Sequence, residues 1–157
     1  MAITAPVRAT GTLTSDATIP TAADTVTIAG VTYTFRAAVG TTTLEVLLGA
    51  NYTASMANLT SAINASSGSG TTYGSNTPIN DWVVATNPTA ATVVLTSKVP
   101  GTVGNNIVTT EAGTHTSFGA GTLTGGTGSV YATIEDLLLT SQCNSDVIKV
   151  LTQMKSS

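Results

Sequence analysis

Apolar and polar residues alternate strictly along two short runs that meet at Ala29-Gly30. The apolar residues of each run share one face, as Val26 and Ile28 do, while threonines occupy the other face. Alternation with period two on both sides of a short turn that contains glycine predicts an antiparallel β-hairpin. Residues 24–35 therefore predict a sheet with one buried face and one solvent-exposed face.

The same alternation predicts further strands, and one stretch of the chain changes to a helical period. We expect strands at residues 8–14, 43–48, 81–86, 91–98, 107–110 and 122–124. Between 51 and 66, Met56, Leu59 and Ile63 recur at spacings that place side chains on one face of a helix. Thr53 is the expected N-cap. This helix should lie with its apolar face against the sheet.

The fold class that these elements predict is mainly β with one packed helix, arranged either as an antiparallel β-sandwich or as an α+β sheet. Seven apolar side chains are expected to be buried together: Ile28, Tyr33, Phe35, Leu59, Ile63, Val93 and Leu95. Glycine and proline mark the expected breaks, namely a turn at Asn87-Pro88, a glycine-rich connection at 99–106 and a glycine-rich hinge at 119–128.

The chain divides into three parts. We expect an N-terminal arm at residues 1–8, a β-rich module at 9–128 and a short helical C-terminal appendage at 129–157. The appendage carries a candidate association surface made of Leu137, Leu138, Leu139, Val147, Ile148, Leu151 and Met154. Because a short helix is marginal alone in water, these side chains must pack either on the sheet of their own chain or on a partner.

Composition indicates what covers the polar face of the sheet. Only 8% of the 157 residues are charged, whereas 33 are threonine. Threonine is β-branched and suits a pleated surface, so hydroxyl groups rather than charges should face solvent. A hydrophobic fraction of 41% with a net charge of only −3 argues against disorder. A surface with so little charge repulsion suits an assembly.

Charge and hydropathy also exclude several classes of partner. Five scattered basic residues in an acidic chain do not make a nucleic-acid footprint. No apolar run approaches the roughly 20 residues of a membrane span. Residues 1–8 lack the apolar core of a signal peptide, so export by such a signal is not expected. The single cysteine, Cys143, allows no internal disulfide and is expected to be a small buried side chain.

No cluster of residues predicts catalysis. His115, the sole histidine, could form a triad with Ser117 and Glu111, but hydroxyls are so frequent that such proximity is expected by chance. The carboxylates of Asp16, Asp24, Glu45 and Asp81 are isolated along the chain and predict neither a paired-carboxylate site nor a calcium loop. One histidine and one cysteine cannot make a structural zinc site within one chain. We expect a protein that is not an enzyme and that uses no cofactor.

Two further features are interpreted as structural. Glycosylation sequons begin at Asn51, Asn58 and Asn64. They are expected coincidences in a chain rich in Asn and Thr, because two of them fall in the predicted helix. Trp82, the only tryptophan, is expected to be a core or sheet-edge anchor rather than a platform for a ligand.

Five segments of the chain together resemble a structural module of tailed-bacteriophage virion proteins. They are Ala9-Thr-Gly-Thr-Leu13, TVTIAGVTYTF at 25–35, the helical residues Asn58-Leu59 with Ala62-Ile63-Asn64, VVLTSKVPGTVGNNI at 93–107 and GTLTGGTG at 121–128. The resemblance covers residues 9–128 and leaves 129–157 outside the pattern. Ala29-Gly30 stands where the module usually has Gly-Gly.

The resemblance implies a non-enzymatic virion protein that is assembled in the cytoplasm of a host bacterium. The most specific expectation is a capsid decoration or cement protein that binds the major capsid protein as a symmetric homo-oligomer, with a trimer favoured. A head-fibre base or tail accessory protein is the alternative within this class. A carbohydrate-binding module, with Trp82, Tyr73 and Asn80 as contacts, is the alternative from another class. Neither nucleic acid nor a membrane is an expected partner.

Overall fold

The computed structural model describes residues 5–128 of the chain. In that range it has eight strands, one α-helix and one 3₁₀ helix, in the order β1 (Arg8–Ser15), β2 (Thr25–Ile28), β3 (Val31–Arg36), β4 (Glu45–Leu47), α1 (Tyr52–Ile63), β5 (Val83–Thr89), β6 (Thr92–Pro100), η1 (Thr102–Asn106), β7 (Thr109–Ala112) and β8 (Thr116–Phe118). The predicted fold class, mainly β with one packed helix, is confirmed. No helix in this range is long and apolar enough to cross a bilayer.

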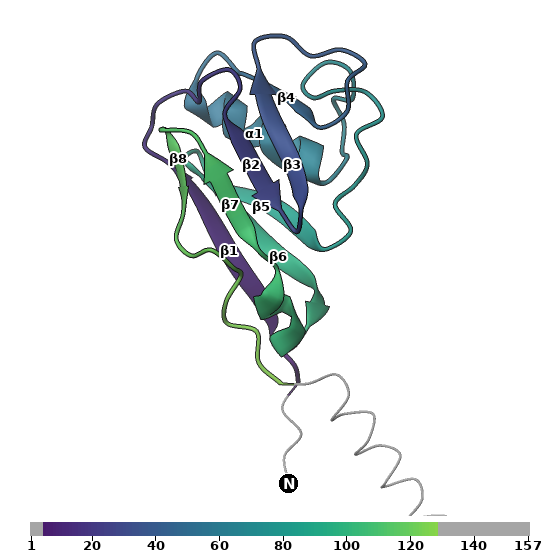
Figure 1. The fold of residues 1–157 in the computed structure, drawn as a ribbon, viewed down its shortest axis with the longest axis vertical. Helices are drawn as coiled ribbons and strands as arrows, with labels where there is room; N and C mark the ends of the chain where they lie inside the picture. The colour runs from purple at the N-terminus through teal and green to yellow at the C-terminus, as the bar shows by residue number, and fades with distance from the viewer. Residues whose placement is uncertain (1–4, 129–157) are drawn as a thin grey trace, which may run out of the picture.

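The strands form two four-stranded sheets that face each other across a shared core (Figure 1). The first sheet has the order β5-β6-β1-β8, and the second has the order β4-β3-β2-β7. Neighbouring strands are antiparallel except for β3 and β4, which run parallel. The architecture is therefore a sandwich, with one parallel edge pair in place of a fully antiparallel arrangement.

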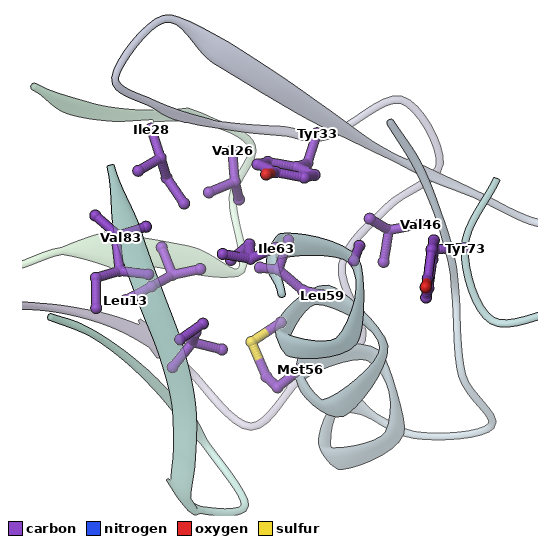
Figure 2. Close-up of a cluster of buried hydrophobic side chains, with 14 of the residues drawn as sticks. Leu13, Val26, Ile28, Tyr33, Val46, Met56, Leu59, Ile63, Tyr73 and Val83 are labelled. Atoms are coloured by element: carbon purple, nitrogen blue, oxygen red, sulfur yellow. The ribbon is translucent and has the colours of Figure 1, made fainter. Parts of the chain in front are cut away.

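The helix α1 closes one side of this sandwich. Met56, Leu59 and Ile63 are fully buried and project from α1 into the space between the sheets, as Figure 2 shows. The helix contacts β4 of the second sheet as well as β5 and β6 of the first. The apolar face predicted from the sequence is thus confirmed, and it joins the two sheets rather than covering one of them.

The N-cap of α1 differs from the predicted residue. The Oδ1 atom of Asn51 accepts a hydrogen bond from the backbone N–H of Ala54 at 2.9 Å. Asn51 has extended backbone angles, whereas Thr53 already lies inside the helix. An asparagine placed three residues before a free N–H satisfies the first turn as well as threonine would, so the helix begins at Tyr52.

The core matches the predicted set. Ile28, Tyr33, Phe35, Leu59, Ile63, Val93 and Leu95 are all completely buried and belong to one apolar cluster. The alternation that predicted the strands is also present, because Val26 is buried between the partly exposed Thr25 and Thr27. On the outer face, the Oγ1 atoms of Thr27 and Thr32 lie 2.9 Å apart across the β2–β3 pair. A second pair of this kind joins Thr89 and Thr92 across β5 and β6, with the Oγ1 atoms 2.7 Å apart.

The β2–β3 hairpin turns through Ala29 and Gly30. Their φ angles are +52° and +82°. Positive φ at both central residues defines a type I′ turn, whose twist matches that of the flanking strands. Glycine adopts this conformation freely, whereas alanine does so at a cost of roughly 1–2 kcal/mol. The hairpin is therefore built as predicted, with local strain at Ala29.

The turn predicted at Asn87-Pro88 is wrong. β5 continues through these residues to Thr89, and the chain reverses at residues 90–91. Proline is tolerated there because β5 lies at the edge of its sheet and needs no second partner. The register between β5 and β6 shifts between Thr86 and Thr89, which accommodates the break.

Short elements near the end of the described chain also differ from the predictions. The glycine-rich connection at 99–106 contains the end of β6 and then η1. β7 begins two residues later than the strand predicted at 107–110, and β8 was not predicted. Strands of three or four residues offer too few positions for a period of two to be recognised.

The glycine-rich stretch at 119–128 is bound to the first sheet and is not a hinge. Thr10 and Thr124 exchange two backbone hydrogen bonds of 2.8 Å. Leu123 is completely buried in the core. The strand predicted at 122–124 is reduced to isolated bridges, because the segment pairs with its neighbours at single residues only.

Both ends of the described chain leave the sandwich together (Figure 1). Val7 pairs with Thr127, and the backbone N–H of Val7 donates to the Thr127 carbonyl at 2.9 Å. Residues 1–4 and 129–157 lie outside the described residues, and so does the predicted helical appendage.

We expect Leu59→Ala to destabilise the protein by about 2–5 kcal/mol, because it empties a buried position between the two sheets. Val84→Ala is the matched control, since Val84 is 46% exposed on β5 and its truncation should change stability by less than about 0.5 kcal/mol. Urea unfolding followed by circular dichroism measures both. Equal midpoints for the two variants would contradict the packing of α1 described above.

Candidate interaction surface

An open groove lies at the end of the sandwich from which both chain ends leave. It has a volume of about 580 Å³, and its walls come from the β2–β3 turn, the residue before β5 and the segment between β6 and β7. The lining residues are Thr27, Ala29, Gly30, Trp82, Val103, Asn106, Ile107 and Val108. None of them carries a charge and most are apolar, so this apolar groove suits an apolar partner.

The apolar groove exists because the two sheets differ in length. β1 and β6 have eight and nine residues, whereas β2 has four. The long strands extend past the tip of the β2–β3 hairpin (Figure 1), and η1 packs against them. The step between the hairpin tip and η1 forms the groove.

Close packing at Gly104 fixes the position of η1. A Cβ atom added to Gly104 would lie 2.9 Å from the Cβ of Ala9 and 2.8 Å from the Oγ of Ser97. Both distances are too short for a side chain, so glycine permits this close approach of η1 to the first sheet. Beyond η1, the backbone N–H of Ala29 donates to the Val108 carbonyl at 2.9 Å, which joins that wall to the hairpin tip.

The buried side chain of Asn80 positions Trp82. Its Oδ1 atom accepts hydrogen bonds from the backbone N–H groups of Trp82 and Val83, at 3.0 and 3.2 Å. Its Nδ2 atom donates to the hydroxyl of Tyr33 at 3.4 Å. Burial raises the pKa of Tyr33, and the hydrogen bond from Asn80 acts against that shift. Lys98 Nζ donates to the Asn80 carbonyl at 2.6 Å, so the strands β3, β5 and β6 converge behind Trp82.

The three candidate carbohydrate contacts are not brought together on the surface. Tyr73 and Asn80 are each only 1% exposed, so their assignment as ligand contacts is wrong. The Tyr73 hydroxyl donates to the Ser66 carbonyl inside the domain. Trp82 is 49% exposed beside the first residue of the edge strand β5, and its side chain is not in the core. Of the two positions predicted for Trp82, the sheet edge is therefore the one observed and the core is not. A tryptophan next to a strand gives no sequence signal that separates these two positions.

Exposed apolar side chains gather at the end that carries the chain termini. Val7, Trp82, Val103 and Val108 are each between 47% and 51% exposed there. Ile19 lies in the loop between β1 and β2, at the opposite end of the sandwich, and is 39% exposed. The valines were not singled out from the sequence. An apolar residue inside a glycine-rich connection, such as Val103, would have been the sequence feature that indicates an exposed apolar side chain.

His115 does not form the triad that its sequence neighbours allow. Its Nδ1 atom lies 3.0 Å from Oδ2 of Asp16, and no hydrogen bond within residues 5–128 joins it to Ser117 or Glu111. The interaction with His115 lowers the pKa of Asp16 below its usual value. In the same part of the chain, no group of three His, Cys, Asp or Glu residues is placed to hold a metal ion.

The three asparagines of the sequons have structural roles. Asn51 caps α1, and Asn58 donates from Nδ2 to the Leu47 carbonyl at 2.9 Å. The side chain of Asn64 donates to the Ala85 carbonyl at 2.8 Å and accepts from the Ala85 N–H at 2.9 Å. Two of the three amide nitrogens are therefore occupied by backbone hydrogen bonds.

The predicted association surface lies outside the described residues. This holds for Leu137, Leu138, Leu139, Val147, Ile148, Leu151 and Met154, and also for Cys143. The comparisons with known proteins do not assign the chain to a family. No protein-family model matches it, and no curated protein is similar enough to be matched.

We expect His115→Ala to raise the pKa of Asp16 toward the ordinary value of 3.8, because His115 is the largest cause of its depression. Since the folded-state pKa is depressed, the stabilisation from this pair is present above pH 3.8 and is lost as the pH falls through the folded pKa. Titration of the Asp16 carboxyl by ¹³C NMR measures the change. Ser117→Ala should leave the titration unaltered, and an equal shift in that variant would contradict the assignment of the lowered pKa to the contact between His115 and Asp16.

Proposed function

We propose that this protein is a non-enzymatic structural protein of a bacteriophage virion, and specifically a capsid decoration protein that binds the major capsid protein and stabilises the head lattice. The resemblance of residues 9–128 to such modules supports the proposal. A second support is that segments from the whole of this range pack into one sandwich with a single apolar cluster. The domain is thus a compact unit that a particle surface could carry.

The observation that carries the proposal is the unequal distribution of exposed apolar groups. Of the seven large apolar side chains that are exposed within residues 5–128, four lie at the end where the chain termini leave: Val7, Trp82, Val103 and Val108. The opposite end is formed by loops rich in Thr and Ala, at 16–24 and 37–44, where Ile19 is the one large apolar side chain that is exposed. A decoration protein needs one adhesive end and one hydrated end, and contiguous apolar surface is what marks an interaction site.

Attachment as a symmetric homo-oligomer, with a trimer favoured, is part of the proposal. The net charge of −3 over 157 residues creates little repulsion between copies. A closed cyclic arrangement would bring the apolar ends of several copies to one face without leaving an unpaired patch. That face would then meet the lattice.

We expect Val7→Asp to weaken binding of the full-length protein to heads of the source bacteriophage that lack it. Burying an unpaired carboxylate costs several kcal/mol, so the affinity should fall by more than about tenfold. Ile19→Asp is the matched control, because it places the same charge at the opposite end of the sandwich and should leave binding unchanged. Co-sedimentation with heads measures both variants. Equal binding by the two would contradict attachment through the end that carries the termini.

Two alternative functions predict different results, one in the co-sedimentation assay and one in a glycan-binding assay. A head-fibre base or tail accessory protein would sediment with fibres or tails instead of with the head shell. A carbohydrate-binding module is favoured only by the half-exposed indole of Trp82, since aromatic faces stack on sugars. That function requires glycan binding by the isolated protein, and Trp82→Ala should abolish it.

A further inference from the structure

We propose that the apolar groove is the docking site of residues 129–157 of the same chain, with the leucines at 137–139 seated against Trp82, Val103 and Val108. This inference goes beyond the proposed function, because it concerns what covers the groove in the free protein. Residues 129–157 would have to leave the groove before Trp82, Val103 and Val108 could contact a capsid, whereas Val7 lies outside the groove lining, so each proposal can fail while the other holds.

The described chain ends directly beside the wall of the groove. The backbone N–H of Thr102 donates to the Gly128 carbonyl at 3.0 Å, and the next residue, Val103, lines the groove. Two residues further on, the Asn105 side chain donates to the Gly126 carbonyl at 3.0 Å and accepts from its N–H at 2.8 Å. These bonds hold the exit point of the chain against η1.

The following residues can reach the groove without difficulty. Leu137 comes nine positions after Gly128, and nine residues extend to at most about 30 Å. Because the exit point adjoins the groove wall, this length exceeds what is needed. A segment tethered so closely has an effective concentration on the order of millimolar at its site.

The chemistry of the segment matches that of the groove. The groove is lined by uncharged residues, and Trp82, Val103 and Val108 each leave about half of their surface exposed. The segment carries a run of three leucines and four further apolar residues, at 147, 148, 151 and 154. Its carboxylates at 135 and 136 precede the leucines, so the apolar run can enter the groove while the charges stay in water.

The tether favours the same chain over a second copy as the source of this segment. A segment from another molecule would have to compete with the local one at its much higher effective concentration. Docking within one chain also removes the exposed apolar groove from a protein that has little charge to keep it soluble.

Trp82 reports occupancy of the groove directly, because it is the only tryptophan in the chain. In the full-length protein we expect Trp82 fluorescence to be shielded from acrylamide. Leu138→Asp should shift the emission to longer wavelength and raise the quenching constant severalfold. Ser141→Asp is the matched control, since it adds the same charge without removing an apolar side chain, and it should change neither quantity. Circular dichroism verifies that both variants are folded.

The dependence on protein concentration distinguishes the two sources of the segment. Shielding that is unchanged on dilution, with light scattering that reports the oligomeric state at each concentration, supports docking within one chain. Shielding that disappears together with an oligomer assigns the groove to a second copy and overturns the proposal. Equal quenching of the wild-type protein and Leu138→Asp, at every concentration, also overturns it.

Discussion

The fold depends on the apolar face of α1. Each sheet ends in an edge strand on the same side of the sandwich, β4 in one and β5 in the other, and α1 contacts both. Burial of Met56, Leu59 and Ile63 therefore joins two sheets that are not otherwise closed on that side. The position of α1 also affects the surface residue Trp82. The carbonyl of Ile63 accepts a hydrogen bond from Asn80 at 2.9 Å, and Asn80 in turn holds the backbone of Trp82.

An asparagine side-chain amide satisfies backbone groups on an exposed edge strand of this protein, where other proteins use charged residues. Exposed edge strands are commonly guarded against pairing with other molecules by lysine or by other charged residues. With 8% charged residues, the chain has few of them to place. Asn64 instead forms both hydrogen bonds of a strand partner with Ala85 on the edge strand β5, and Asn105 does the same with Gly126. A side-chain amide copies the donor and acceptor of a peptide group, so it satisfies an edge without extending the sheet.

The sequence predicts those elements in which apolar residues recur with one regular spacing over several positions. The β2–β3 hairpin and the face of α1 each have several apolar positions in one period, and both are confirmed. The apolar groove could not be predicted, because it arises from the unequal lengths of β2 and β6 and from the packing of η1. The hinge prediction failed because glycine content describes conformational freedom, whereas the buried Leu123 and its backbone partners decide the outcome.

The antiparallel pairing of Val7 with Thr127 has a mechanical consequence. Tension that pulls the two ends of the domain apart would load the Val7–Thr127 bonds first and the Thr10–Thr124 bonds next, so they would open one after another like a zipper. Tension applied to both ends together, against the rest of the molecule, would instead load the long β1–β6 ladder in shear, where many hydrogen bonds share the force. The domain should therefore resist being lifted from a surface far better than being peeled open by its own ends.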